Sequence, residues 1–398
     1  MATRYSPKIP TDGLVFYYDT GNSKSYKGEP TTNLITDTAA FDSSFWNQKS
    51  GTITANSVIG PRGVQNAAKI VATNTDPYIY SSAIVTASTG NNTWSIWVKG
   101  VGSTVGKSAQ VRINFSGTAT GTADTNASVN LTDDWQLLQT TANVTSGGTI
   151  KFGLEAPNGA VSGDIMYFAD PMFEQKSHAT QFTVGARSVS GSLLDLTRRK
   201  TIDLSNVSFD SDAMLDFDGT SDYIAFSDNI YDVADEGTIS ELTISAWVKW
   251  DEFCSSGTYD EIISWWQGGT NTYADGFLGT SVYSVIGDSA ANPGIRFGDG
   301  WTNTGYNFTS ATDVDKWWNI TAVKTADNAY IYINGVLEAT KGSALSWGFN
   351  GVATIGRHSS GGSEYLNGKI GNIQLHSRAL TPAEIQQNYN ALKGRFGI

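Results

Sequence analysis

One phrase occurs twice in this chain, first from position 93 and again from position 243. Thr93 to Lys99 and Thr243 to Lys249 both follow the pattern T-x-S-x-W-V-K. In the second copy, the aliphatic positions 244, 246 and 248 alternate with Ser245, Trp247 and Lys249, which is the period of a β-strand with one buried face. A D-x-W phrase follows each copy, at Asp133 and at Asp315. Matching strands in matching order predict two β-sandwiches of similar plan.

Length and composition agree with two β domains. A chain of 398 residues is too long to fold around one ordinary hydrophobic core. Its 42 glycines, 12% aromatic residues and only 16% charged residues favour strands and turns. The single cysteine, Cys254, excludes an intramolecular disulfide, which fits folding in a reducing cytoplasm. The net charge of -12 argues against a nucleic-acid partner. No apolar stretch approaches the roughly 20 residues of a membrane span, and the chain does not open on an apolar signal segment.

The chain divides into three segments. Residues 1–30 contain a predicted strand at 14–18, a polar loop and a break at Pro30. Residues 31–184 contain eight or more short strands and no helical period, which predicts a jelly roll. Residues 185–398 predict a second sandwich, so the expected fold class is all-β with one short C-terminal helix.

Local signals in the last segment are clear. Asp218-Gly219 predicts a turn between two strands, and alternating Tyr and Ile residues lead into Asn334-Gly335, the sequence of a type I′ hairpin. Thr381-Pro382 with Glu384 predicts a helix that begins with a capping box and that Gly394 ends.

The last 185 residues or so resemble a known family. The resemblance rests on a series of short phrases: Leu215 to Gly219, Asp222 to Ile224, Thr243 to Trp250, Tyr332 to Val336, Ile355-Gly356, Asn367 to Asn372, and Ser377 to Ile385. Together they resemble laminin G-like, concanavalin A-like lectin domains, and they are most similar to those of tail-fibre and other structural proteins of tailed bacteriophages. The phrase Met172-Phe173-Glu174 through Ala179-Thr180 closes a second region, and with it residues 31–180 resemble carbohydrate-binding-module jelly rolls of phage tail proteins.

The same resemblance implies an insertion. In such lectin domains a segment like Asp12 to Asp19 is usually followed shortly by one like Leu194 to Thr197, and here about 150 residues separate them. The jelly roll is therefore expected to interrupt the lectin sandwich. Insertion at a surface loop is thermodynamically cheap, because loop-closure entropy grows only logarithmically with length.

No catalytic constellation stands out. His178, His358 and His376 lie far apart in the sequence without a spaced partner. The adjacent pair Asp260-Glu261 would point to opposite faces of a strand, although related folds include glycosidases with paired carboxylates. We expect no enzyme activity, and a glycan depolymerase remains an alternative.

Calcium is the one cofactor that the sequence suggests. Asp216, Asp218, Asp222 and Asp228 place hard oxygen ligands near a tight turn, as calcium prefers. Related lectin domains often add an acidic residue from the last strand, where this chain has Gly371-Asn372. The expected calcium site therefore departs from the family pattern.

Aromatic residues in polar, Gly-rich loops are the candidate carbohydrate-binding residues. A sugar needs an exposed ring for stacking and nearby polar groups for its hydroxyls. These candidates are Trp265, Trp266, Tyr273, Trp301 and Tyr306, and a subunit interface would use the same residue types. The strand residues Trp97, Trp135, Trp247 and Trp317 are expected in the cores instead.

These features predict a non-enzymatic virion surface protein, a fibre or capsid-decorating subunit, that binds host-cell glycans. The leading alternative is a purely architectural virion subunit. The expected partners are host-surface glycans, other virion proteins and further copies of the chain, as a trimer that gains avidity. We expect synthesis in the bacterial host cytoplasm and a final location on the virion surface.

Overall fold

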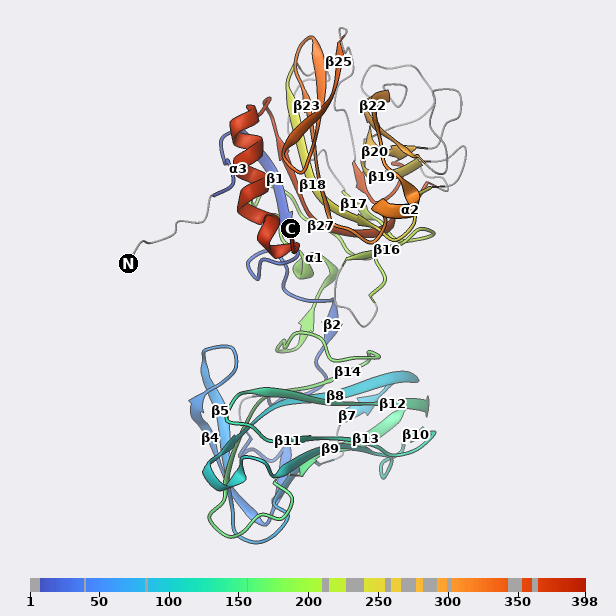
Figure 1. Cartoon of the computed structure of the whole chain (residues 1–398). Helices are drawn as coiled ribbons and strands as arrows, with labels where there is room; N and C mark the ends of the chain where they lie inside the picture. The colour runs from blue at the N-terminus through green and yellow to red at the C-terminus, as the bar shows by residue number, and fades with distance from the viewer. Residues whose placement is uncertain are drawn as a thin grey trace, which may run out of the picture. The chain divides into compact units, whose positions relative to one another are not determined.

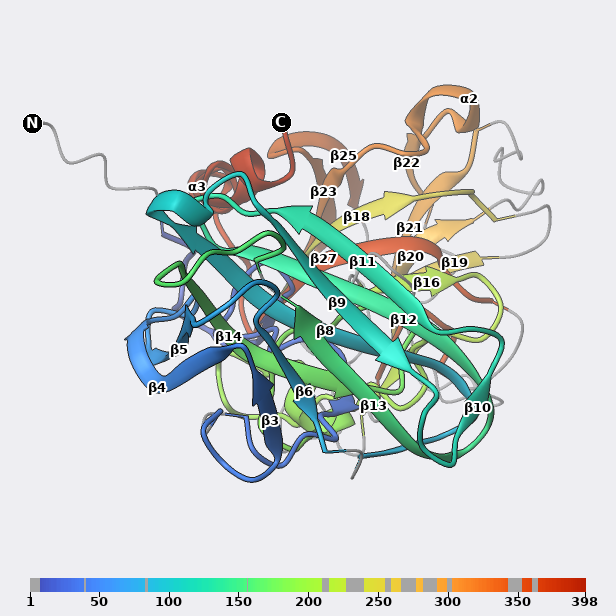
Figure 2. The same cartoon turned by 90° about the horizontal axis from the view of Figure 1, so that it is seen from below.

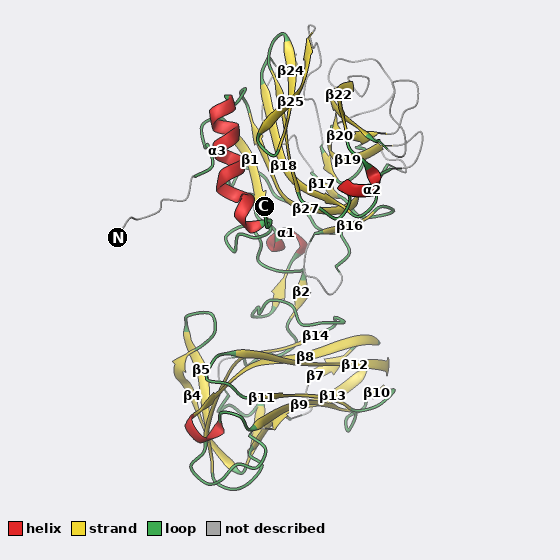
Figure 3. Ribbon diagram, in the orientation of Figure 1, coloured by secondary structure: helices red, strands yellow, loops and turns green. Residues whose placement is uncertain are grey.

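The computed structural model shows an all-β protein (Figures 1 and 3). It describes residues 8–38, 41–82, 85–155, 157–209, 215–226, 240–254, 259–265, 277–281, 292–298, 303–342, 353–359 and 364–398. The chain forms two compact units. Met1–Gly28 and Val189–Ile398 together form the split unit, and Glu29–Ser188 forms the inserted unit. The predicted fold class, two sandwiches with the first inserted into the second and one short C-terminal helix, is confirmed.

The split unit is a sandwich of two antiparallel sheets. The first has the order β1 (Leu14–Asp19), β27 (Asn367–His376), β18 (Leu242–Trp250), β23 (Trp318–Lys324), β24 (Asn328–Ile333) and β25 (Val336–Gly342), and β16 (Asp216–Asp218) also pairs with β27. The second has the order β17 (Ile224–Ala225), β26 (Thr354–Ile355), β19 (Tyr259–Ser264), β20 (Phe277–Ser281), β21 (Gly294–Gly298) and β22 (Asn303–Asn307).

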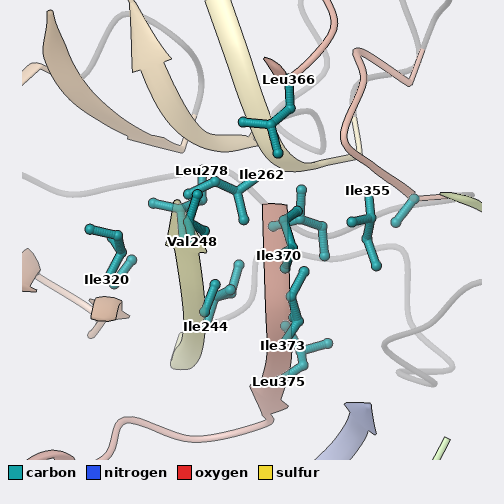
Figure 4. Close-up of a cluster of buried hydrophobic side chains, with 14 of the residues drawn as sticks. Ile244, Val248, Ile262, Leu278, Ile320, Ile355, Leu366, Ile370, Ile373 and Leu375 are labelled. Carbon is teal, nitrogen blue, oxygen red and sulfur yellow. The ribbon is translucent and has the colours of Figure 1, made fainter. Parts of the chain in front are cut away.

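The repeated phrase supplies the centre of this core. Ile244 and Val248 are fully buried and lie among aliphatic side chains of both sheets, including Ile373 and Leu278 (Figure 4). The opposite face of β18 is also covered, because Trp247 stacks on Tyr389 and on Phe396, with ring centroids 5.7 and 4.3 Å apart. The predicted alternation along this strand is confirmed.

The inserted unit is a second sandwich with its own core. One sheet has the order β10 (Thr120–Gly121), β12 (Gln136–Ser146), β8 (Gly90–Val101), β14 (Ile165–Glu174), β5 (Gln65–Ala72) and β4 (Gly51–Ile59). The other has the order β11 (Thr125–Asn130), β9 (Ser108–Asn114), β13 (Gly148–Glu155), β6 (Tyr78–Ser81) and β3 (Trp46–Lys49), with β7 (Val85–Ala87) also paired to β13. Figure 2 shows this second sheet as one continuous layer.

Two chain segments, one around residue 28 and one around residue 189, connect the units, and backbone hydrogen bonds join these two segments to each other. On the split-unit side, Tyr26 pairs with Leu193 and the Lys27 amide donates to the Ser192 carbonyl at 2.8 Å. On the inserted-unit side, β2 (Thr31–Thr32) pairs with β15 (Ala186–Arg187). The contacts place the boundaries at 29 and 188, a few residues outside the expected 31 and 184.

Several local predictions are confirmed and others are wrong. Asn334 and Gly335 both have positive φ, 52° and 80°, as a type I′ turn requires. Thr381 and Glu384 form the predicted capping box of α3 (Pro382–Leu392). The helix ends at Leu392 with Lys393 as its C-cap, and Gly394 follows within a 3-10 turn, Lys393–Arg395, without the positive φ of a glycine C-cap.

Three further details differ from the sequence prediction. The strands on either side of Gly219 do not form a hairpin, since β16 pairs with β27 and β17 pairs with β26. Two four-residue helices, α1 (Val189–Ser192) and α2 (Ser310–Asp313), were not expected. In the described part of the chain, no helix is long and apolar enough to cross a membrane.

Of the four strand tryptophans expected in the cores, only Trp247 is fully buried. Trp97 is half-buried because it lies on the face of β8 opposite the core residues Ile96 and Val98. Trp135 and Trp317 are half-buried as well, since each precedes its strand by one residue. The alternation along a strand assigns each side chain to one of the two faces of the sheet. It does not indicate whether other residues pack over the outer face.

Candidate functional site

The strongest candidate site is the outer face of the sheet that contains β6. Tyr78 and Tyr80 lie on one face of this strand and the buried Ile79 lies on the other, because side chains alternate along a strand. Both tyrosine rings are partly exposed, and their centroids are 5.4 Å apart with the rings tilted by 43°. The Nζ atom of Lys49 lies 5.5 Å from the centre of the Tyr78 ring.

Polar side chains from the two adjoining strands surround the tyrosines. Gly153 of β13 is paired with Tyr80 of β6 on one side and with Arg112 of β9 on the other. Two residues along β13 in one direction, Glu155 is paired with Tyr78. Two residues in the other direction, Lys151 is paired with Asn114. We call the set Tyr78, Tyr80, Arg112, Asn114, Lys151, Gly153 and Glu155 the tyrosine face.

Hydrogen bonds orient the polar groups of the tyrosine face. The Arg112 guanidinium lies 3.2 Å from the Glu155 carboxylate and donates to the Gln110 side chain at 2.6 Å. The Asn114 amide donates to Asp124 at 2.6 Å. These contacts hold planar donors and acceptors near the rings while leaving other polar atoms available, which preorganises the surface.

A glycine hollows the centre of the tyrosine face. The face lines an open hollow of about 430 Å³. A Cβ atom at Gly153 would lie 2.9 Å from the Tyr80 Cβ and 2.7 Å from the Ile79 carbonyl, closer than real contacts allow. Gly153 therefore keeps the floor of the hollow flat and gives Tyr80 its position.

This combination of groups suits a carbohydrate. A sugar ring presents an apolar C–H face, which stacks on an aromatic ring, and a rim of hydroxyls, which bond to amides, carboxylates and guanidinium groups. The strands under the tyrosine face are anchored from the other side of the sheet, where Phe152, Leu154 and Val111 are buried in the core of the inserted unit.

The prediction that Trp265 binds sugar is wrong. Its side chain is fully buried in the core of the split unit, immediately after β19, and a ring with no exposed surface cannot stack on a ligand. The sequence places it beside a Gly-rich loop, but the strand that precedes it sets its direction inward. Trp266, Tyr273 and Trp301 lie outside the described residues.

Tyr306 is described, and it lies on strand β22 rather than in a loop. Its half-buried ring packs edge-on against Phe308, with centroids 5.3 Å apart, and against the core of the split unit. Burial, with the nearby charges of Glu338 and Asp313, raises the pKa of its hydroxyl. The structure thus gives this ring a packing role in the split unit.

The three aspartates expected to bind calcium do not converge on one site. Asp216 pairs with Lys369 at 2.6 Å, and the buried Asp222 accepts hydrogen bonds from Ser208. Asp218 accepts bonds from the backbone and hydroxyls of Thr220 and Ser221, which lower its pKa despite partial burial.

Each of these carboxylates already has its own protein partners. They are not among the described groups of close ligand atoms, so the structure does not gather Asp216, Asp218 and Asp222 around one ion. Asp228, the fourth member, lies outside the described residues. The tight turn that suggested a metal is instead held by Asp218 itself.

The histidines have distinct surroundings. His178 lies 2.7 Å from the buried carboxylate of Glu29. His376 is buried against the Pro10 carbonyl, and burial lowers its pKa. His358 lies beside Glu261 and Glu364, two residues that no sequence pattern connects to it.

The sequence analysis did not single out Tyr78 and Tyr80. The available signal was the alternation of aromatic and aliphatic residues at Tyr78, Ile79 and Tyr80, which already puts both rings on one face. What the sequence did not show is that this face stays uncovered, or that Arg112 and Glu155 arrive beside it from other strands.

Comparison with known proteins finds a match to one family model in the second half of the chain. Residues 218–386 match the family model Laminin_G_3, described as the concanavalin A-like lectin/glucanases superfamily. No curated protein matches the chain.

Solved structures with partial similarity include a Trypanosoma rangeli sialidase in complex with 2,3-difluorosialic acid (16% identity, TM-score 0.36, 50% of this chain and 31% of that one). Another is domain 4 of a Geobacillus stearothermophilus arabinanase in complex with arabinotriose (15% identity, TM-score 0.35, 51% of this chain and 93% of that one). A third is the binding domain of botulinum neurotoxin DC in complex with rat synaptotagmin II (17% identity, TM-score 0.36, 51% of this chain and 49% of that one).

Proposed function

We propose that this protein is a non-enzymatic virion surface subunit, a fibre or capsid decoration, that binds host-cell glycans through the tyrosine face. The observation that carries the proposal is the pair Tyr78 and Tyr80, presented outward above the hollow at Gly153. The lectin-type family match of residues 218–386 supports carbohydrate binding, and the phrases that resemble phage structural proteins support the virion role.

Binding would combine stacking and hydrogen bonding. The C–H face of one sugar ring would lie on Tyr80 or Tyr78, and its hydroxyls would bond to Asn114, Glu155 and Lys151. Each stacked ring contributes about a kcal/mol, so a single site binds weakly. Several copies on one particle would raise the avidity, which is the reason to expect a trimer.

A glycan array that includes polysaccharide from the host surface tests the proposal. We expect Tyr80→Ala to weaken binding roughly tenfold, the effect of about 1.4 kcal/mol, with the melting temperature of the inserted unit nearly unchanged. The matched control is Tyr167→Ala, a partly exposed tyrosine on the opposite sheet of the same unit. Equal binding by Tyr80→Ala and the parent protein would contradict the assignment.

The second candidate is a purely architectural virion subunit. The observation in its favour is the strand β25, where Val336 and Leu337 are 56% and 47% exposed, as expected of a surface that contacts another copy or another virion protein. No glycan binding by the parent protein, with a stable oligomer by light scattering, would favour this candidate. A monomer both free and released from particles would count against it.

The location and the lack of catalysis have their own tests. Mass spectrometry and antibody labelling of purified particles would show whether the chain reaches the virion surface after synthesis in the host cytoplasm. Release of reducing sugar from host polysaccharide would show that the protein is a depolymerase and would overturn the non-enzymatic assignment.

A further inference from the structure

Three titratable side chains from separate segments meet in the split unit. Glu261 lies on β19, His358 follows β26, and Glu364 precedes β27. The Nε2 atom of His358 is 3.9 Å from an oxygen of Glu261 and 3.9 Å from an oxygen of Glu364, and one ligand atom from each residue lies within 4.8 Å of the others. Among the described residues, this is the only group of three such side chains.

Glu261 is the unusual member of the group. It is fully buried, and neither carboxylate oxygen has a hydrogen-bond partner among the described residues. Burial raises its pKa, and the charges of Glu364 and Asp260 raise it further. The neighbouring Ser264 hydroxyl lowers this pKa by less, and the hydrogen bond that it makes is with the Ser359 hydroxyl. A buried carboxylate without a partner costs several kcal/mol unless something compensates for it.

The imidazole does not supply that compensation by itself. A separation of 3.9 Å between nitrogen and oxygen is too long for a hydrogen bond, so His358 does not satisfy either acid directly. Two donors that bind one metal at about 2.0–2.2 Å lie roughly 3.3–3.6 Å apart at tetrahedral angles. The two distances from His358 are a few tenths of an ångström wider, and all three ligand atoms lie within 4.8 Å of one another, so side-chain rotations would bring the donors to a shared ion.

The backbone already holds the three segments together. The His358 amide donates to the Glu364 carbonyl at 3.1 Å, and Arg357 pairs with Tyr365. The Gly356 amide donates to the carbonyl of Ile262, the residue after Glu261, at 3.2 Å. The two acids and the histidine are thus fixed in place without a ligand, as a binding site requires.

We propose that Glu261, His358 and Glu364 form a binding site for a divalent transition-metal ion, with zinc as the preferred ion. One imidazole and two carboxylates suit zinc, whereas calcium and magnesium favour all-oxygen sets. Three protein ligands leave a fourth position for water. The ion would neutralise the Glu261 carboxylate. It would also join β19 to the segment that follows β26 and to the one that precedes β27, so the ion would have a structural role.

Zinc chloride added to the full-length, chelator-treated protein tests the proposal. We expect one bound ion per chain by calorimetric titration and a saturable rise in the melting temperature of the split unit, because a ligand that binds only the folded state stabilises it. Calcium chloride at the same concentration should change neither readout.

Variants identify the ligands. Outer-shell changes alone weaken metal binding about 10–100-fold, so Glu261→Gln and Glu364→Gln should each weaken it at least tenfold. The matched control is Glu338→Gln, an exposed glutamate of the same unit, which should bind zinc as the parent does. Glu261→Gln removes a buried charge without changing the shape of the side chain, so it should fold in the chelated state.

Two results would overturn the site. The first is the absence of zinc binding by the parent protein. The second is zinc binding that Glu261→Gln and Glu364→Gln leave unchanged, which would place the ion elsewhere, for example at Cys254. A cobalt(II) spectrum gives a separate check, since the tetrahedral visible bands should be lost in both variants.

Discussion

The guanidinium of Arg395 donates two hydrogen bonds to the carboxylate of Asp19, at 2.6 and 2.5 Å, and so joins the first strand of the chain to its last turn. Asp19 is 1% exposed and also accepts from the Tyr17 hydroxyl and the Gly21 amide. The pair raises the pKa of Arg395, chiefly through its hydrogen bonds to Asp19. The turn that follows α3 is thereby tied to β1, the edge strand of the first sheet.

Arg395→Met should destabilise the split unit. The change leaves a buried carboxylate with only neutral partners, and hydrogen bonds to charged groups contribute about 1.5–3 kcal/mol. We expect a lower melting temperature for the split-unit transition, with the inserted-unit transition unchanged in the same calorimetric scan. Lys316→Met, a largely exposed cation of the split unit, is the control. Equal stability of Arg395→Met and the parent would contradict the importance of the pair.

Removal of the inserted unit should leave the split unit folded. Tyr26 pairs with Leu193, so Gly28 and Val189 can be joined through a short flexible linker without moving either strand. Deletion of residues 1–28 should instead be damaging, because β1 pairs with β27 along Leu14 to Asp19 and its loss exposes an apolar edge. Urea unfolding of both proteins is the measurement. A fragment 189–398 as stable as the spliced protein would show that β1 adds nothing to this core.

The sequence predicted this architecture where the signal was local. The alternation in Ile244 to Val248, the positive-φ pair at Asn334-Gly335 and the capping box at Thr381 each depend on a few neighbouring residues, and the structure confirms all three. Such patterns hold because a strand, a turn and a helix end are decided mainly by nearby backbone geometry.

The site residues were harder to predict, because they depend on which strands become neighbours. Trp265 is buried in the core of the split unit, which distant segments build. The pairing of β19 with β26 brings Glu261 near His358, and the bridge between Arg357 and Tyr365 brings Glu364 to the same place. No local pattern carries that information. For Asp218, the same turn chemistry that suggested calcium is explained by hydrogen bonds to Thr220 and Ser221.

Acid should weaken the inserted unit through Asp164. Hydrogen bonds from Lys107, from Ser103 and from the Val161 amide lower the pKa of this carboxyl from 3.8 to about 2. Because the folded-state pKa is the lower one, the stabilisation is fully present above about pH 4 and is lost as the pH falls towards 2.

Asp164→Asn should therefore lower the melting temperature of the inserted unit at pH 6, and the difference from the parent should shrink between pH 4 and pH 2. Calorimetry at several pH values checks this prediction. Asp133→Asn, an exposed aspartate of the same unit, should show little difference at any pH. A difference that stays constant down to pH 2 would mean that Asp164 acts by packing and not by charge.

Trp265→Ala should destabilise the split unit strongly without affecting glycan binding. Its side chain is fully buried among residues of the core, and removal of a buried tryptophan costs about 3–5 kcal/mol through lost contacts and the cavity left behind. Trp97→Ala, at a half-buried position of the inserted unit, should cost less. Urea midpoints measure the first effect and binding to the glycan array measures the second. If Trp265→Ala kept the urea midpoint of the parent protein and lost glycan binding, the Trp265 ring would belong to a sugar-binding site. The tyrosine face would then not be the main glycan-binding site.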